Sequence, residues 1–210
     1  MRRILMSAAA IAAVASMAAC NKADNTGAGG SVGSDSPGQA EPVNAAQDAM
    51  SAPVGMASAA TLGRTTDGFV TNAAISDMYE IEAGKLAQQK GQNAQVKAFG
   101  AMMVKDHTTM STKMKAALSK AGANVTAPTK LDERRQGMID NLKAANGADF
   151  DTAYLAQQEA AHNEALTLVR TYAENGDNAA LKAHASEGAP KIQQHLDKVK
   201  QLQDTSKKQG

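Results

Sequence analysis

Apolar residues recur every three or four positions along most of the chain after residue 66, and this spacing constrains the fold more than any other feature. It matches the 3.6-residue turn of an α-helix, so each stretch presents one apolar face. The same region is rich in alanine and contains few glycines and prolines, and the single cysteine of the chain excludes an internal disulfide. The sequence therefore predicts an all-α domain that is stabilised by a packed core.

Four long apolar patterns with short connections predict an antiparallel four-helix bundle with a ferritin-like arrangement over residues 66–203. A shorter helix, about residues 132–145, is expected before the third long helix, and residues 204–210 are expected to form a frayed tail. Pro190 lies inside the last pattern, so we expect a kink or break near residues 188–190. Each long helix has a candidate N-cap: Asp67, Asn93, Asp149 and Asn178.

Cys20 ends a segment that resembles the signal peptide of a bacterial lipoprotein. A basic head, Arg2 and Arg3, is followed by about a dozen apolar residues and then by Ala18 and Ala19. The apolar run is too short for a transmembrane helix, which needs about 18 residues. We therefore expect removal of residues 1–19, lipidation of Cys20 and export to the cell envelope. Asn21 favours the outer membrane, facing the periplasm, over the inner membrane.

Residues 20–65 are expected to form a flexible tether between the lipid anchor and the bundle. They consist mainly of Gly, Ser, Ala, Asn and Pro, which bury too little surface to offset the entropy lost on ordering. A transient helix remains an alternative for the part that holds Val43, Met50, Val54 and Met56.

The charge balance excludes a nucleic-acid partner. Without Arg2 and Arg3 the chain keeps 20 basic and 21 acidic residues, whereas nucleic-acid binding needs clustered positive charge. Aromatic residues make up 3% and tryptophan is absent, which also argues against base stacking. The sequence has neither a glycine-rich phosphate loop nor a nucleophile motif.

All four histidines fall on the apolar faces of predicted helices, and Glu80 can point inward beside them. Imidazole and carboxylate groups that project into a bundle can hold a metal ion. The predicted ligands of a divalent metal are Glu80, His107, His162 and His195, with Asp106 and Glu159 as possible additional ligands. Iron or zinc is favoured over copper.

Two other interpretations stay open. Glu159 and His162 supply one of the two Glu-x-x-His motifs of a di-iron site, so a complete di-iron centre is not expected. Four methionines around His107 could hold Cu(I), although methionines on such a face more often fill a core: Met102, Met103, Met110 and Met114. Alternatively, the histidines form a structural or pH-sensitive polar cluster.

Several of these segments together resemble the domain-of-unknown-function 4142 family. The resemblance rests on Glu80–Ala87, Met103–Thr108, Phe150-Asp151-x-x-Tyr154-Leu155 followed by His162, and Leu181-Lys182-Ala183 with Pro190 and His195. It implies a ferritin-like bundle in exported bacterial proteins, often lipoproteins, and no established activity. The family positions present here are Glu80, Asp106, His107, Asp151, Tyr154, His162, Pro190 and His195. His184 stands where the family usually has an aromatic or aliphatic residue, so it is not among the predicted ligands.

These features predict a non-catalytic cell-envelope lipoprotein that binds a divalent metal in its core. The alternatives are a metalloenzyme or iron or copper sequestration protein, and a purely structural interaction module. A metal site requires that the inward atoms of Glu80, His107, His162 and His195 converge to within about 5 Å of one another.

Overall fold

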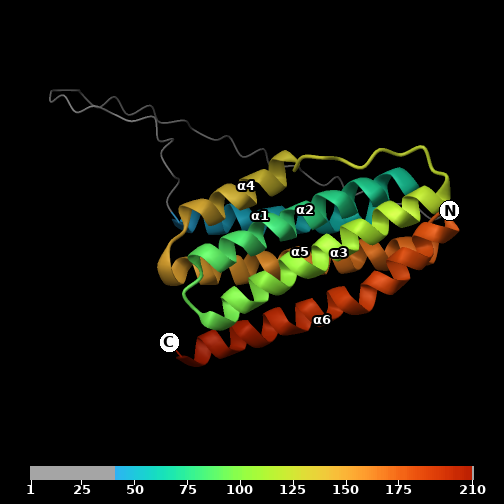
Figure 1. Cartoon of the computed structure of the whole chain (residues 1–210). Coiled ribbons are helices and arrows are strands. Elements are labelled where there is room, and N and C mark those ends of the chain that lie inside the picture. Colours follow the sequence, from blue (N-terminus) through green and yellow to red (C-terminus); the bar gives the residue numbers. More distant parts are fainter. Residues whose placement is uncertain (1–40, 210) are drawn as a thin grey trace, which may run out of the picture. The chain divides into compact units, whose positions relative to one another are not determined.

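The computed structural model describes residues 41–209, in which six helices and no strands are present (Figure 1). The predicted signal peptide, the lipidation site Cys20 and the tether up to residue 40 lie outside the described residues. The helices are α1 (Glu41–Leu62), α2 (Thr66–Lys90), α3 (Ala94–Ala121), α4 (Glu133–Ala144), α5 (Gly147–Asn175) and α6 (Ala179–Gln209). The all-α prediction is confirmed.

Helices α2, α3, α5 and α6 pack into a bundle in which each helix touches two neighbours. α2 contacts α3 and α5, and α6 contacts the same two helices from the other side. Figure 1 shows α4 and α6 on opposite sides of the bundle. The short helix that was expected before the third long helix is α4, which packs against α2 and α5. None of the helices within residues 41–209 combines the length and apolar character that spanning a membrane requires.

Two of the predicted N-caps differ in the structure. Thr65 caps α2, because its Oγ1 accepts a hydrogen bond from the backbone N–H of Gly68 at 3.2 Å, whereas Asp67 lies within the first turn. α5 begins at Gly147, which has a positive φ of 60°, so Asp149 also lies inside the helix. The N-cap therefore lies two residues before the predicted one in α2 and three residues before it in α5, where it is Asn146.

Helix α1 corrects the prediction of a tether that reaches residue 65. The helix packs against α5, and its Ala59 is buried in the core. Gly55 allows the close approach, because a Cβ at this position would lie 2.0 Å from Oε2 of Glu164. Composition misled the prediction because α1 packs through small residues, while its Met50 and Val54 remain exposed.

Helix α6 is continuous through Pro190 and extends to Gln209, so the structure shows neither the expected break nor a tail that begins at residue 204. Pro190 removes one backbone hydrogen bond and is exposed. The flanking residues Ala185 and Ile192 are both buried against the bundle. Packing on both sides of the proline therefore holds the helix together.

The core of the bundle consists of two apolar clusters. One contains Tyr79, Phe99, Met103, Ala161 and Val199, and the other contains Phe69, Ala165, Leu168, Ile192 and Leu196. Along α5, the first cluster ends at Ala161 and the second begins at Ala165, so His162 lies at their boundary. The histidine layer described next therefore separates two apolar halves of one core.

Candidate metal centre

Three histidines from three helices meet in the centre of the bundle. His107 of α3, His162 of α5 and His195 of α6 are each only 1–2% exposed. One ring nitrogen from each histidine lies within 4.8 Å of those of the other two. The ring centroids are 5.4 to 5.8 Å apart, so the three rings surround a common space. We call these three residues the histidine triad.

One nitrogen of each triad ring is hydrogen-bonded to a carboxylate or to a backbone carbonyl. The pairs are His107 Nδ1 with Asp77 Oδ1 at 2.8 Å, His162 Nδ1 with the carbonyl of Gln158 at 2.8 Å, and His195 Nε2 with Asp106 Oδ2 at 2.9 Å. Because a carboxylate or carbonyl oxygen cannot donate, the ring proton lies on the bonded nitrogen. The remaining nitrogen of each neutral ring then carries a lone pair.

The remaining nitrogens, His107 Nε2, His162 Nε2 and His195 Nδ1, are buried and have no hydrogen-bond partner. An unpaired buried polar atom is unfavourable, and most such atoms in proteins are paired. A metal-bound histidine commonly donates its second nitrogen to a carboxylate or a carbonyl, as all three rings do here. The arrangement is that of a buried histidine triad that could hold a metal ion.

The separations between the triad nitrogens are compatible with metal binding after small adjustments. Three nitrogens bound tetrahedrally to one zinc ion at about 2.0–2.1 Å lie about 3.3 Å apart. The observed separations reach up to 4.8 Å, so modest ring rotations would bring the nitrogens into coordination distance. The three imidazoles would fill three positions of a tetrahedron and leave the fourth open.

The structure places the other predicted ligands around the triad. Glu80 is buried, but its Oε1 lies 3.7 Å from Nδ1 of His162, which is the protonated side of that ring. Its Oε2 accepts a hydrogen bond from Gln158 Nε2 at 2.7 Å. Asp106 orients His195 through the bond given above. Glu159 points elsewhere and accepts a hydrogen bond from Gln203 at 3.0 Å.

Sequence reasoning missed Asp77, which is 6% exposed and orients His107. A signal existed, because Asp77 and Glu80 are three residues apart on α2 and therefore share one helix face. His184, the fourth histidine, lies outside the triad. It is half-buried and lines a small cavity together with Asp77 and His107.

Burial sets the charge state of the triad. Burial lowers the pKa of His162, and it lowers the pKa of His195 to about 4 although Asp106 opposes the shift. Both rings are therefore neutral at pH 7. Burial also disfavours the charged form of His107, but the hydrogen bond and charge of Asp77 outweigh it and raise the pKa of His107. At neutral pH, His162 and His195 thus each present a free lone pair. At His107, a metal ion would compete with a proton for the ring nitrogen.

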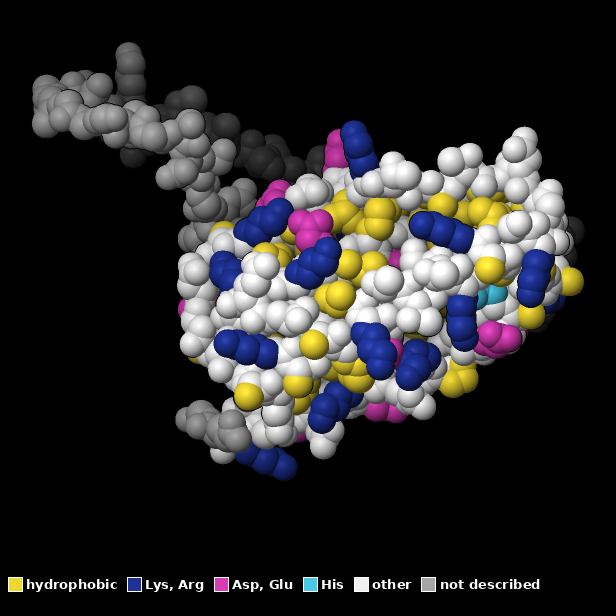
Figure 2. Space-filling view, viewed as in Figure 1, with side chains coloured by type: hydrophobic (Ala, Val, Ile, Leu, Met, Phe, Trp, Pro, Cys, Tyr) yellow, Lys and Arg dark blue, Asp and Glu magenta, His cyan; other side chains and the backbone are white. Residues whose placement is uncertain are grey.

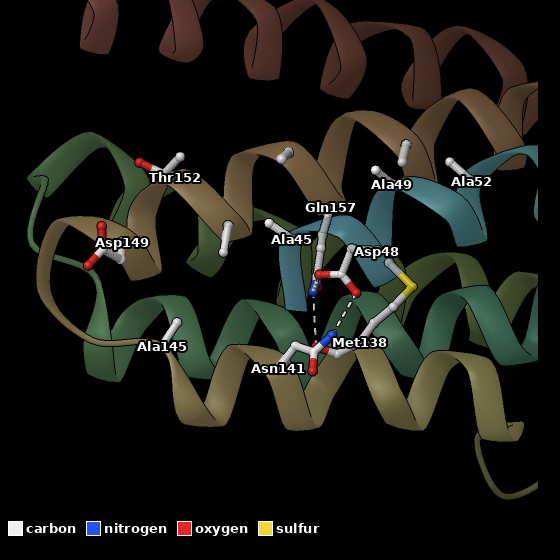
Figure 3. A pocket seen from close by; sticks show the side chains of 13 residues that line it. Ala45, Asp48, Ala49, Ala52, Met138, Asn141, Ala145, Asp149, Thr152 and Gln157 are labelled. Carbon is white, nitrogen blue, oxygen red and sulfur yellow. Dashed lines mark hydrogen bonds between the residues drawn. The ribbon is translucent and has the colours of Figure 1, made fainter. Parts of the chain in front are cut away.

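A second cavity of about 490 Å³ lies between α1, α4 and α5 (Figure 3). Its walls are mainly alanine, and three of its polar side chains, Asp48, Asn141 and Gln157, bond one another. Asp48 accepts hydrogen bonds from Asn141 Nδ2 at 2.9 Å and from Gln157, whose Nε2 also donates to the carbonyl of Met138 at 3.0 Å. The Oε1 of Gln157 accepts a hydrogen bond from the hydroxyl of Tyr79 at 2.8 Å. We call these side chains the Asp48–Gln157 network.

The sequence matches the family described as Domain of unknown function (DUF4142) over residues 51–202. The chain belongs to the DUF4142 family. The match contains all three triad histidines and begins inside α1, about 15 residues before the domain start that the sequence suggested. No curated protein and no solved structure is significantly similar to the chain.

Proposed function

We propose that this protein is a lipid-anchored component of the bacterial cell envelope whose ferritin-like, antiparallel four-helix bundle holds a divalent metal ion at His107, His162 and His195. One observation carries the metal assignment. In three buried rings that lie together, one nitrogen of each ring has no hydrogen-bond partner, while its second nitrogen is bonded to a carboxylate or a carbonyl.

The unpaired nitrogens support metal binding over a purely structural polar cluster. A cluster that serves only to fix helix packing would pair its donors with its own acceptors, as the Asp48–Gln157 network does. Here each of three adjacent buried rings has a nitrogen with no hydrogen-bond partner, which leaves these atoms without favourable interactions. A cation accepts all three lone pairs at once.

The ligand type favours zinc or iron. Neutral imidazoles bind zinc, iron, copper and nickel, and the carboxylate–histidine pairs of Asp77 and Asp106 are a common feature of zinc sites. The triad residues are 1–2% exposed, so a substrate of ordinary size has no direct contact with them. This enclosure favours holding an ion over chemistry on an external substrate.

The membrane anchor is proposed from the N-terminal sequence. The basic head, the short apolar run and the small residues before Cys20 support lipidation and export. Two or three acyl chains would attach the protein firmly, because each buried methylene contributes about 0.8 kcal/mol. Cys20→Ser is expected to move the protein from the detergent phase to the aqueous phase in detergent partitioning. Retention of the variant in the detergent phase would contradict the anchor.

Metal content of the full chain tests the proposed function. The protein is produced in metal-replete medium, extracted in detergent without a histidine tag, and measured by elemental mass spectrometry. We expect about one ion per chain, and its loss from a His107→Ala/His162→Ala variant. His184→Ala is the matched control, since it removes a histidine outside the triad, and it should keep the ion. A folded protein that contains no metal after metal-replete preparation would contradict the proposal.

A further inference from the structure

The burial of the triad raises the question of how an ion reaches it. The three rings are 1–2% exposed, and apolar clusters close the bundle core on both sides of them. An ion that crossed either cluster would lose its water shell in an apolar medium, which is strongly unfavourable. An access route with polar or thioether groups along one wall would lower this barrier.

A small inner cavity adjoins the triad. It has a volume of about 30 Å³. Asp77, His107, Met110, His184 and Gly188 line one part of it, and the rest is lined mainly by apolar residues of the second cluster, such as Phe69, Leu168 and Ile192. This volume is comparable to the share of one water molecule in the liquid, so the cavity can hold one water or one partly dehydrated ion. His107 is the triad residue that lines it, beside its hydrogen-bond partner Asp77.

An outer cavity of about 140 Å³ lies next to the inner one, at the surface between α3 and α6. Its exposed walls include Lys113, Glu187 and Lys191. Met110, His184 and Gly188 line both cavities, so these three residues form the partition between them. We call them the partition residues.

The groups on this route can bind a cation in succession. Asp106 and Glu187 provide carboxylates in the outer cavity, although Lys113 and Lys191 balance their charge. Basic and acidic side chains are likewise interspersed over the face shown in Figure 2. The net charge of this surface therefore attracts a cation only weakly, and the donor atoms at the partition determine whether the cation passes. The imidazole of His184 and the flexible thioether of Met110 are both metal donors.

We infer that the metal ion enters the triad between α3 and α6, from the outer to the inner cavity, with His184 as the transfer ligand at the partition. This inference rests on the proposed metal binding. The ion exchanges outer-cavity carboxylates for His184, then passes Met110 and reaches Nε2 of His107. His162 and His195 complete the coordination. His184 therefore controls the rate of loading and contributes no ligand to the final site.

Gly188→Leu provides a direct test, because it fills the partition. A Cβ at Gly188 meets only Cε of Met110, at 3.7 Å, so the backbone accepts a side chain whose outer atoms then occupy the route. Leucine also has the higher helix propensity. Gly137→Leu on α4 is the matched control, since a Cβ there meets nothing within 4 Å.

The measurement is the rate of Zn²⁺ uptake by the metal-free full chain in detergent, followed by stopped-flow with a zinc indicator. We expect uptake by Gly188→Leu to be slower by about tenfold or more, because the remaining access requires local opening of the bundle. The final zinc content should be unchanged. Gly137→Leu should load at the rate of the parent protein.

His184→Leu is the second variant, and it keeps the test decisive if Gly188→Leu does not fold. It retains bulk at the partition but removes the donor nitrogen, so uptake should again slow while the final zinc content stays the same. Loading of either folded variant at the parent rate would overturn the route and leave the proposed function intact. Absence of zinc uptake by the parent protein would overturn both.

Discussion

The histidine triad and the Asp48–Gln157 network are both polar clusters in the interior of a helical bundle, but they differ in how they satisfy their hydrogen bonds. In the network, Gln157 donates to Asp48 and to the carbonyl of Met138 (Figure 3). It also accepts a hydrogen bond from Tyr79. In the triad, one nitrogen of each ring is paired and the other is unpaired. The network pairs its own donors and acceptors, whereas the triad leaves three buried ring nitrogens without a partner.

This difference distinguishes a structural polar cluster from a candidate binding site. Burial of polar atoms is stabilising only when their hydrogen bonds are made, so an incomplete cluster weakens the fold unless something fills it. The account therefore predicts that metal affects the triad and leaves the network unchanged, and that changes in the network alter stability without altering metal binding.

The largest expected effect is the stabilisation of the folded protein by metal. At a free zinc concentration about 1,000 times the dissociation constant, the free energy of unfolding should rise by about 4 kcal/mol. Urea denaturation of the full chain with and without zinc measures it. Zinc should not stabilise His107→Ala/His162→Ala, whereas Gln157→Leu should respond as the parent does. Equal stabilisation of the double variant would place the ion elsewhere.

Acid should weaken the metal-free protein by a somewhat smaller amount. The pKa values of His162 and His195 are lowered by burial, the latter to about 4, so their contribution is complete above the unfolded value of 6.5 and is lost as the pH falls toward 4. Protonation of His195 accounts for up to about 3 kcal/mol of this fall in the free energy of unfolding. His107 acts oppositely, because its raised pKa stabilises the fold below pH 6.5.

The pH dependence is measured by urea denaturation of the metal-free chain between pH 7.5 and pH 4, values chosen to bracket the pKa range. His195→Gln should make the free energy of unfolding depend less on pH, because it removes a histidine whose pKa is lowered to about 4. A curve that is unchanged by this substitution would show that His195 does not titrate in a buried environment.

Asp77→Asn should weaken metal binding by about 10- to 100-fold, since it removes a charged partner that orients a ligand. The amide oxygen of asparagine can still accept the proton of His107 Nδ1, so the fold should be retained. Asp67→Asn is the matched control, because Asp67 is an exposed acidic residue on the same helix. Competition against a zinc chelator measures the affinities, and equal values for both variants would contradict the role of Asp77.

The smallest expected effect is that of Gln157→Leu. The substitution leaves the Tyr79 hydroxyl and the Met138 carbonyl without their partner, and it should lower the free energy of unfolding by about 1–3 kcal/mol. Zinc content and affinity should remain at parent values. A loss of metal on this substitution would show that the two clusters are coupled, and it would contradict their independence.

The sequence was sufficient to predict the helical class and the inward position of the triad. An apolar pattern with the helical period identifies which face is buried, and His107, His162 and His195 lie on that face. The family was recognised from the same segments. These features depend on local spacing, which a single sequence contains.

Other features depend on contacts between helices and were not predictable from local spacing. Asp77 resembles a solvated residue until the rotation of α2 directs it toward His107. Arg135 is 1% exposed, because it stacks over the ring of Tyr79 and pairs with Glu164, although arginine is seldom buried. Helix α1 has few large buried residues, so only its close packing on α5 reveals it as part of the bundle.

The most direct test of the account is zinc K-edge X-ray absorption of the full chain loaded with one equivalent of zinc. The account predicts a first shell that includes three imidazole nitrogens at about 2.0–2.1 Å, with the outer-ring scattering that imidazole produces, and its loss in the His107→Ala/His162→Ala variant. A first shell that consists of oxygen or sulfur atoms, or a spectrum that the double variant leaves unchanged, would contradict the assignment of the triad as the metal site.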